Sequence, residues 1–168
     1  MVKNAIYFVK PELFDLIRNQ DGKWDDKKDR PLVCVLESDE IDGLYYAIPL
    51  GNLAHRDEKA RKRIQRYLDI PEEKIESCFY HIGKTTVHSI FFISDIIPIT
   101  DEYIDRPLIN LYAKRAHIIK NKTLIAEIER KALRILAYEK NYPNYFRQNI
   151  TATKNALIKE LKESKKSQ

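Results

Sequence analysis

Apolar residues in the first hundred positions come mostly in short runs separated by polar turns, a pattern typical of strands. Pro49 places the end of its run at a sheet edge or a bulge. A hairpin turn is expected at Gly83-Lys84-Thr85, between two of the runs. The sequence predicts strands over residues 5–9, 32–37, 44–50, 77–82, 86–93 and 96–99.

Helices are predicted where apolar residues repeat every three or four positions. An apolar stripe around Ile64 predicts a helix over residues 53–69. From about Arg106 onward the spacing is helical, with a break near Lys120-Asn121. Shorter helices are predicted over residues 11–18, which begin with Pro11, and over residues 151–163.

Strands in the first part of the chain and helices in the second indicate an α+β fold. We expect a single domain over residues 1–168, with mostly sheet in 1–105, helices in 106–163 and a frayed tail in 164–168. The expected sheet is a small, strongly bent antiparallel sheet or barrel, covered by the C-terminal helices. A length of 168 residues with 43% hydrophobic residues is enough for a stable core.

Two cysteines, Cys34 and Cys78, both lie within apolar runs. We expect buried free thiols, which are typical of a reducing compartment. No apolar run is long enough to span a bilayer, and no cleavage signal is visible at the N-terminus. The sequence therefore predicts a soluble, cytoplasmic protein that does not enter a membrane.

Positive charge is concentrated at the end of the chain. The net charge is +5, but residues 106–168 hold 15 Lys and Arg against 5 Asp and Glu. This imbalance indicates a polyanionic partner, of which nucleic acid is the most common. The alternative is a solvated helical surface with a lysine-rich tail.

The segment from Lys84 to Ser89 has the highest density of reactive side chains, including Thr85, Thr86 and His88. A phosphate-binding P-loop is excluded, because the position that requires its first glycine is Cys78. RNA cleavage by the 2′-hydroxyl needs a base, a proton donor and a cation, and this segment supplies them. The alternative is an ordinary hairpin with a polar turn.

A second group of polar residues comprises Tyr46, Asn52 and His55, which surround the end of one strand. They would bind or position RNA, whereas in the alternative one of the paired tyrosines is simply part of the core. His81 and His88 have no third ligand at a helpful spacing, so we expect no metal site and no cofactor.

Basic residues repeat along the predicted helix at 53–69 and form a stripe that matches a phosphate backbone. The alternative is a solvated face. The stripe consists of Arg56, Lys59, Lys62, Arg63 and Arg66. A second basic group is expected on the long helical segment and consists of Lys114, Arg115, Lys120 and Lys122. Trp24, in a polar loop, would either stack on a base or fold back onto the core.

The order of these elements resembles the type III toxin endoribonucleases of the ToxN/AbiQ class, as a divergent branch. The resemblance covers roughly residues 4–140 and includes the strand ends Ala47-Ile48-Pro49-Leu50 and Ile96-Ile97-Pro98-Ile99. It implies a compact MazF-like fold with added helices and a metal-independent endoribonuclease that prefers certain RNA sequences and leaves a 2′,3′-cyclic phosphate. It also implies inhibition by pseudoknot repeats of an antitoxin RNA in a closed toxin–RNA assembly, with a role in phage abortive infection or growth arrest.

One departure from the family pattern moves the expected catalytic groups. Where the best-known branch has Thr-Ser after Pro-Leu, this chain has Gly51-Asn52. We therefore expect His88 to act as base or acid and Lys84 to stabilise the phosphorane. Thr85 and Thr86 would orient the phosphate, and Ser89 and Tyr46 complete the expected set. The alternative functions are a non-catalytic RNA- or DNA-binding module and a protein-interaction domain for an acidic partner.

Overall fold

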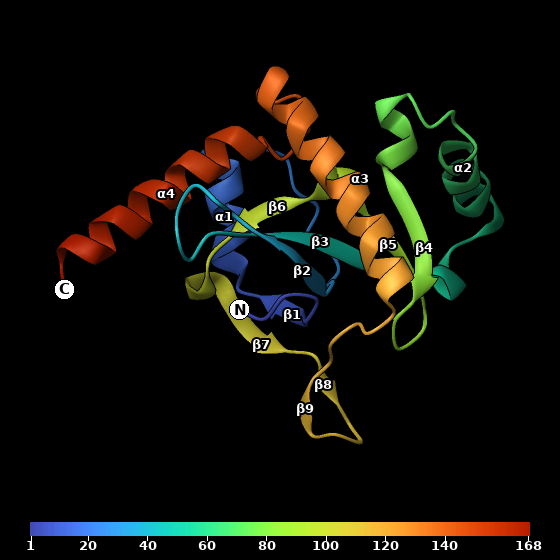
Figure 1. Cartoon of the computed structure of the whole chain (residues 1–168), viewed down its shortest axis with the longest axis horizontal. Helices are drawn as coiled ribbons and strands as arrows, with labels where there is room; N and C mark the ends of the chain where they lie inside the picture. Colours follow the sequence, from blue (N-terminus) through green and yellow to red (C-terminus); the bar gives the residue numbers. More distant parts are fainter.

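A computed structural model describes all residues, 1–168, as an open antiparallel sheet with helices on both faces (Figure 1). Seven strands form this sheet in the order β4-β5-β3-β2-β1-β7, with β6 also paired to β3. The strands are β1 (Ile6–Val9), β2 (Leu32–Glu37), β3 (Tyr45–Asn52), β4 (Tyr80–Lys84), β5 (His88–Phe92), β6 (Ile97–Ile99) and β7 (Ile104–Pro107). A separate small hairpin is formed by β8 (Ile109–Asn110) and β9 (Arg115–Ala116). The helices are α1 (Pro11–Asn19), α2 (Glu58–Leu68), α3 (Lys122–Asn141) and α4 (Ile150–Lys166).

The long strand β3 is where the sheet bends. Along one edge it pairs with β6 up to Ala47 and with β5 from Leu50 onward. Pro49 lies between these two pairings, where its missing N–H costs no ladder hydrogen bond on that side. The predicted α+β fold with a bent antiparallel sheet is confirmed, and the sheet is not closed into a barrel because β4 and β7 remain as edges.

Helix α3 covers one face of the sheet and forms the main core with it. Ile128, Ala132 and Ile135 of α3 share a buried cluster with Ile48 and Phe91 of the strands. Separate apolar clusters join α1 to β2, β3 and β6 through Leu13 and Ile17, and α2 to β5 through Ile64, Ile90 and Phe92.

The prediction of helical structure from Arg106 onward is wrong for the first part of that segment. Residues up to Ala116 form β7, β8 and β9, and α3 begins only at Lys122. Leu111 and Ile118 are 85% and 37% exposed, so their helix-like spacing does not reflect a buried face. The position expected to break the helical segment, near Lys120-Asn121, is instead the start of α3, where the Asn121 side chain accepts a hydrogen bond from the Leu124 N–H at 3.1 Å and caps the helix.

Several element boundaries also differ from the prediction. Residues 77–78, predicted as the start of a strand, belong to a 3₁₀ turn, and β4 begins at Tyr80. Helix α2 begins at Glu58, where Asp57 caps it, and residues 53–55 form a separate 3₁₀ turn. The hairpin turn lies at residues 85–87, because Lys84 pairs with His88 across the strands. Helix α4 continues to Lys166, so most of the expected frayed tail is helical. Cys34 and Cys78 are both buried and free, as predicted. None of the helices has the length and apolar character needed to cross a membrane.

Candidate functional site

The β4–β5 hairpin separates the predicted catalytic residues onto two faces. Lys84 and His88 are cross-strand partners, and both are exposed. Ser89 is only 2% exposed, and strand alternation turns it to the opposite face from His88. The structure therefore brings Lys84 and His88 together at the solvent-facing end of the hairpin.

Hydroxyl groups gather on the other face of the hairpin. The Thr85 and Ser89 hydroxyl oxygens lie 2.7 Å apart, and the Ser89 hydroxyl also donates to the Val87 carbonyl at 3.2 Å. These two residues, together with Thr86 and Asn52, line a small pocket of about 140 Å³. Neither Lys84 nor His88 lines this pocket.

Asn52 reaches this pocket because β3 pairs with β5 and places Asn52 opposite Ser89. Its side-chain oxygen accepts the Ala54 N–H at 2.9 Å and so caps the 3₁₀ turn that carries His55. His55 is exposed on this turn and does not line the pocket.

Tyr46 lies elsewhere, in the core, 8% exposed. It lines a different cavity, of about 540 Å³, together with residues of α3 and α4 such as Glu139 and Lys154. Burial raises the pKa of Tyr46 to about 12. The structure thus does not bring Tyr46 to the hairpin turn.

The two histidines of the hairpin do not face each other. His81 pairs with Phe91, three residues along β4 from Lys84, so it lies about 10 Å along the strand from the His88 pair. It is half-buried, and burial followed by the charge of Lys131 lowers its pKa. No three His, Cys, Asp or Glu side chains are grouped as metal ligands.

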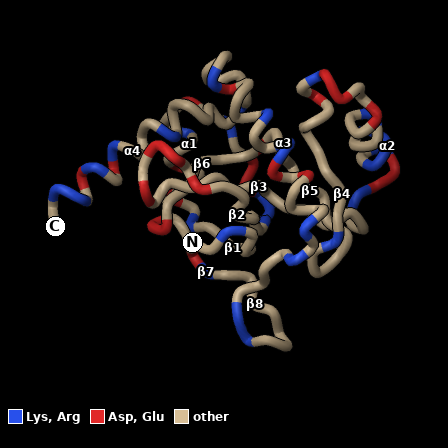
Figure 2. The backbone as a smooth tube through the Cα atoms, in the orientation of Figure 1, with Lys and Arg blue, Asp and Glu red and all other residues tan.

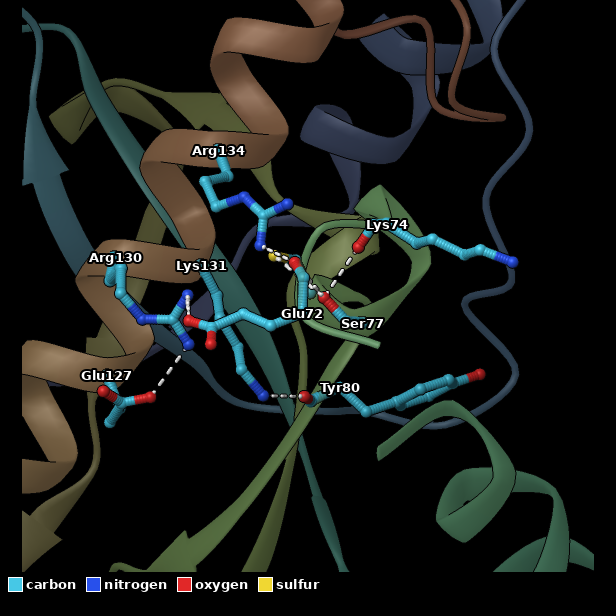
Figure 3. A network of polar contacts seen from close by, with 9 residues as sticks. Glu72, Lys74, Ser77, Tyr80, Glu127, Arg130, Lys131 and Arg134 are labelled. Carbon is cyan, nitrogen blue, oxygen red and sulfur yellow. Dashed lines mark hydrogen bonds and ion pairs between the residues drawn. The ribbon is translucent and has the colours of Figure 1, made fainter. Parts of the chain in front are cut away.

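Contacts from α3 hold β4 and the loop around Glu72 that precedes it, as Figure 3 shows. The Lys131 ammonium donates to the Tyr80 carbonyl at 2.9 Å, and burial lowers the pKa of Lys131. Arg130 forms an ion pair with Glu72 at 3.3 Å, and Arg134 donates to the Glu72 carbonyl at 2.6 Å. These basic residues of α3 therefore make contacts within the protein.

The predicted basic stripe is divided between two environments. Lys59, Lys62 and Arg66 are exposed on α2, and Lys62 pairs with Glu58 at 2.9 Å. Arg56 lies before the helix, contrary to the prediction, with its guanidinium 5.3 Å from the Phe92 ring. Arg63 is also exposed on α2, and together with Arg56 it lines a cavity on the inner side of this helix.

The second basic group does not lie on a helix, so that prediction is wrong for most of its members. Lys114 and Arg115 are in the β8–β9 hairpin, which extends from the body of the molecule (Figure 2). Lys120 lies in the following linker, and only Lys122 belongs to α3. Pairing of β7 with β1 directs the chain away from a helical path at this point.

Trp24 folds back onto the protein. Its ring stacks on Phe14 of α1 with centroids 5.7 Å apart and an angle of 11° between the planes. Trp24 also lines the cavity on the inner side of α2, which has a volume of about 480 Å³. The sequence analysis missed this cavity, because Arg30, Arg56, Arg63 and Arg147 come from separate segments. The one local indication of this cavity in the sequence is that Trp24 and Arg30 lie in the same polar loop.

No family model matches the sequence, and no curated protein matches it. The fold, however, is similar to solved structures. The structure of AbiQ, a lactococcal anti-phage endoribonuclease of the type III toxin–antitoxin system, aligns with a TM-score of 0.61 and 16% identity over 94% of this chain and 99% of AbiQ. A bacterial type III toxin that is selectively inhibited by a non-coding RNA pseudoknot aligns with a TM-score of 0.48 and 17% identity over 85% of this chain and 80% of that one. Over nearly the full length of both chains, this protein therefore has the fold of AbiQ, a type III toxin.

Proposed function

We propose that this chain is an endoribonuclease toxin of a type III toxin–antitoxin system. The observation that carries the proposal is the alignment with AbiQ, which covers 94% of this chain and 99% of that endoribonuclease. The sequence resemblance at Pro49-Leu50 and Pro98-Ile99 also supports the proposal, because this resemblance rests on the sequence and not on the fold. The toxin would act in phage abortive infection or growth arrest.

In the proposed reaction, the RNA supplies its own nucleophile. The 2′-oxygen bonds to phosphorus while the bond from phosphorus to the 5′-oxygen breaks, which leaves a 2′,3′-cyclic phosphate. The 2′-hydroxyl proton passes to a base, and an acid protonates the leaving 5′-oxygen. His88 is the proposed base or acid, and Lys84, its cross-strand partner, stabilises the charged phosphorane. Both are exposed, so RNA can reach them directly.

The pocket on the other face of the hairpin is the proposed place where a neighbouring phosphate is oriented. Thr85, Thr86 and Ser89 supply hydroxyl groups there, and Asn52 lies beside them. His55 extends this surface on its 3₁₀ turn. Tyr46 takes no part in the proposal, because it lines a separate cavity.

The proposed inhibitor is an antitoxin RNA with pseudoknot repeats, bound in a closed assembly of toxins and RNA. The exposed cations Lys59, Lys62 and Arg66 form one surface for its phosphates, and the β8–β9 hairpin with Lys114 and Arg115 forms another. Substrate RNA would use the same surfaces, so that inhibitor and substrate compete.

The test is RNA cleavage by the purified chain in the presence of EDTA, with product ends identified chemically. The wild type and a His117→Ala control should cut RNA and leave 2′,3′-cyclic phosphate ends. His88→Ala should cut at least about a hundredfold more slowly, the usual loss for a general acid or base. Cleavage that requires added Mg²⁺ would contradict the proposed metal-independent reaction.

A non-catalytic RNA-binding module is the second candidate function. It is favoured by the hydrogen bonds already made within the pocket, where Thr85 pairs with Ser89 and Asn52 caps a turn. These bonds have a structural use without any substrate. In this case the purified chain would bind RNA with the same affinity in the His88→Ala variant, and no new RNA ends would form.

A further inference from the structure

The cavity on the inner side of α2 has the size and lining of a small-molecule site. Its volume of about 480 Å³ falls within the range of ligand pockets, which is about 300–1,000 Å³. It shares no lining residue with the hydroxyl pocket at the hairpin turn. Phe92 and Ser89 are on opposite faces of β5, so the two cavities lie on opposite faces of the β3–β5 ladder.

Arg30, Arg56 and Arg63 line this cavity and form no ion pair, although the carboxylates of Asp25 and Asp95 also line it. The guanidinium carbons of Arg30 and Arg56 lie 5.0 and 5.3 Å from the centre of the same Phe92 ring. Burial, followed by the charges of Arg30 and Arg63, lowers the pKa of Arg56, and no carboxylate opposes this effect. The Arg56 Nε atom is buried and has no hydrogen-bond partner. Like charges held together in this way favour a bound anion.

A fourth arginine of the cavity, unlike these three, is paired with a carboxylate. Arg147 also lines the cavity, but it makes two hydrogen bonds to the Asp95 carboxylate at 3.1 and 3.0 Å. Its charge is therefore already compensated. Arg30, Arg56 and Arg63, together with Lys28, are the lining cations that have no carboxylate partner.

The fold holds Arg56 in this position before any ligand arrives. The Arg61 side chain donates to the carbonyls of Arg56 and Leu53, both at 3.1 Å, and so fixes the turn before α2. Gly51 leaves the space for the guanidinium, because a Cβ atom there would lie 2.7 Å from Arg56 Nη2 and 2.8 Å from the Phe92 ring. An anion would thus meet an arginine that is already placed.

Aromatic side chains form another part of the cavity wall. Tyr80 packs edge-on against Phe92 at 5.9 Å and also contacts Tyr67 at 5.2 Å. Trp24 joins them from the loop before β2, stacked on Phe14. Aromatic rings beside cationic groups are the combination that binds an unstacked base next to its phosphate.

We propose that this cavity binds a nucleotide, with its phosphate on Arg30, Arg56 and Arg63 and its base against the aromatic wall. The nucleotide is either free or a residue of an RNA chain. The second source rests on the proposed function, whereas the site itself does not. The cavity is separate from the hydroxyl pocket, and neither Lys84 nor His88 lines it, so it is a binding site distinct from the proposed catalytic groups.

Trp24, the only tryptophan of the chain, provides a direct reporter of binding. The experiment titrates the protein with the four nucleoside monophosphates, with inorganic phosphate and with a 2′-O-methyl trinucleotide that cannot be cleaved. Calorimetry gives the affinity, and Trp24 fluorescence locates the ligand. We expect saturable binding with a Kd of about 1 mM or tighter and a change in Trp24 fluorescence. A monophosphate that binds as tightly as the trinucleotide indicates a free nucleotide, and a tighter trinucleotide indicates RNA.

Matched variants test the arginine wall. Arg56→Gln and, separately, Arg30→Gln should each weaken nucleotide binding at least tenfold. Lys162→Gln also removes one positive charge, from an exposed position of α4 away from the cavity, and should leave the affinity unchanged. Unfolding midpoints identify any variant that has lost its fold, and two separate arginines keep the test informative if one of them has.

Two outcomes would overturn the proposal. One is the absence of binding by any nucleotide or by the trinucleotide. The other is binding of inorganic phosphate as tight as that of every nucleotide, which would show an anion site without base recognition. The proposed function is tested apart from this site, because His88→Ala should retain full nucleotide affinity. A chain that binds nucleotides but cuts no RNA would contradict only the nuclease, and an active nuclease that binds none would contradict only the cavity site.

Discussion

Two glycines determine how closely neighbouring elements approach in this protein. Gly51 brings Arg56 and Phe92 against β3, as described above. Gly83 does the same for β4 and α3, because a Cβ atom there would overlap the Leu124 side chain. Leu124 belongs to the main core, so this close approach is part of the packing that fixes the β4–β5 hairpin.

Substitution of Gly83 by alanine should therefore destabilise the fold. We expect Gly83→Ala to lower the free energy of unfolding by about 1–3 kcal/mol, the usual cost of overpacking. Urea denaturation measures this loss. The double variant Gly83→Ala with Leu124→Ala should cost less than the sum of the two single changes, since the added methyl group then has space. Strict additivity would contradict the packing argument.

His81 should make the stability of the fold depend on pH. Burial lowers its pKa in the native state, so the unfolded chain binds a proton more readily than the folded chain does. The contribution of neutral His81 to the free energy of unfolding is therefore fully present above the ordinary histidine pKa of about 6.5. It is lost as the pH drops through and below this value. Urea denaturation at pH 7 and pH 5 should show a smaller loss in His81→Gln than in the wild type. The same substitution at exposed His55 is the control, and an equal pH dependence in His81→Gln and wild type would refute this role.

The two cysteines should be unreactive in the native protein. Both are free and buried, and burial raises the pKa of Cys34 to about 11, so almost none of it is thiolate at neutral pH. An aromatic disulfide reagent should therefore label neither thiol in buffer and both in denaturant. Rapid labelling of the folded chain would show that one of them is accessible.

At the scale of elements, the sequence predicts a strand well where both faces of the strand are buried. Residues 32–37 are an example, since five of the six are buried in the central strand β2. The prediction fails at residues 106–120, where Leu111 and Ile118 have helical spacing but are exposed. Spacing alone does not reveal burial, and the pairing of β7 with the distant β1 overrides it.

The two cavities illustrate the same limit for sites. Ser89 and Asn52 were both predicted from the sequence, but only the pairing of β3 with β5 places them opposite each other. The arginine wall depends on contacts between the loop before β2, the turn before α2 and helix α2 itself. Such a site has no local pattern, so it emerges only from the fold.

Helix α2 carries the basic surface that is best placed for RNA. If Lys59 and Lys62 contact phosphates, the double variant Lys59→Gln with Lys62→Gln should reduce the salt dependence of RNA binding. The slope of log K against log salt should become shallower by about 1.5, the counterion release expected for two contacts. Filter binding at several salt concentrations measures it. Lys159→Gln with Lys162→Gln removes two exposed charges from α4 and should leave the slope unchanged; an equal change in both double variants would argue for a general charge effect.

At the scale of the whole molecule, the charge imbalance has two separate uses. Residues 106–168 carry the excess of positive charge, but Arg130, Lys131 and Arg134 contact residues 72–80 within the protein (Figure 3). The cations that remain exposed lie on the β8–β9 hairpin, on α2 and along α4 (Figure 2). An RNA partner that contacts α2 and the β8–β9 hairpin would thus meet two separate basic surfaces rather than a single basic domain.

The central claim is that this fold cuts RNA with groups on the β4–β5 hairpin. The most direct measurement is induction of the chain in a bacterial host, wild type beside His88→Ala, with all RNA ends mapped and growth followed. We predict growth arrest and new RNA ends in the wild type, and neither in the variant at equal protein levels. Arrest with the same new ends in both would contradict the role of His88, and normal growth without new ends in either would contradict the nuclease itself.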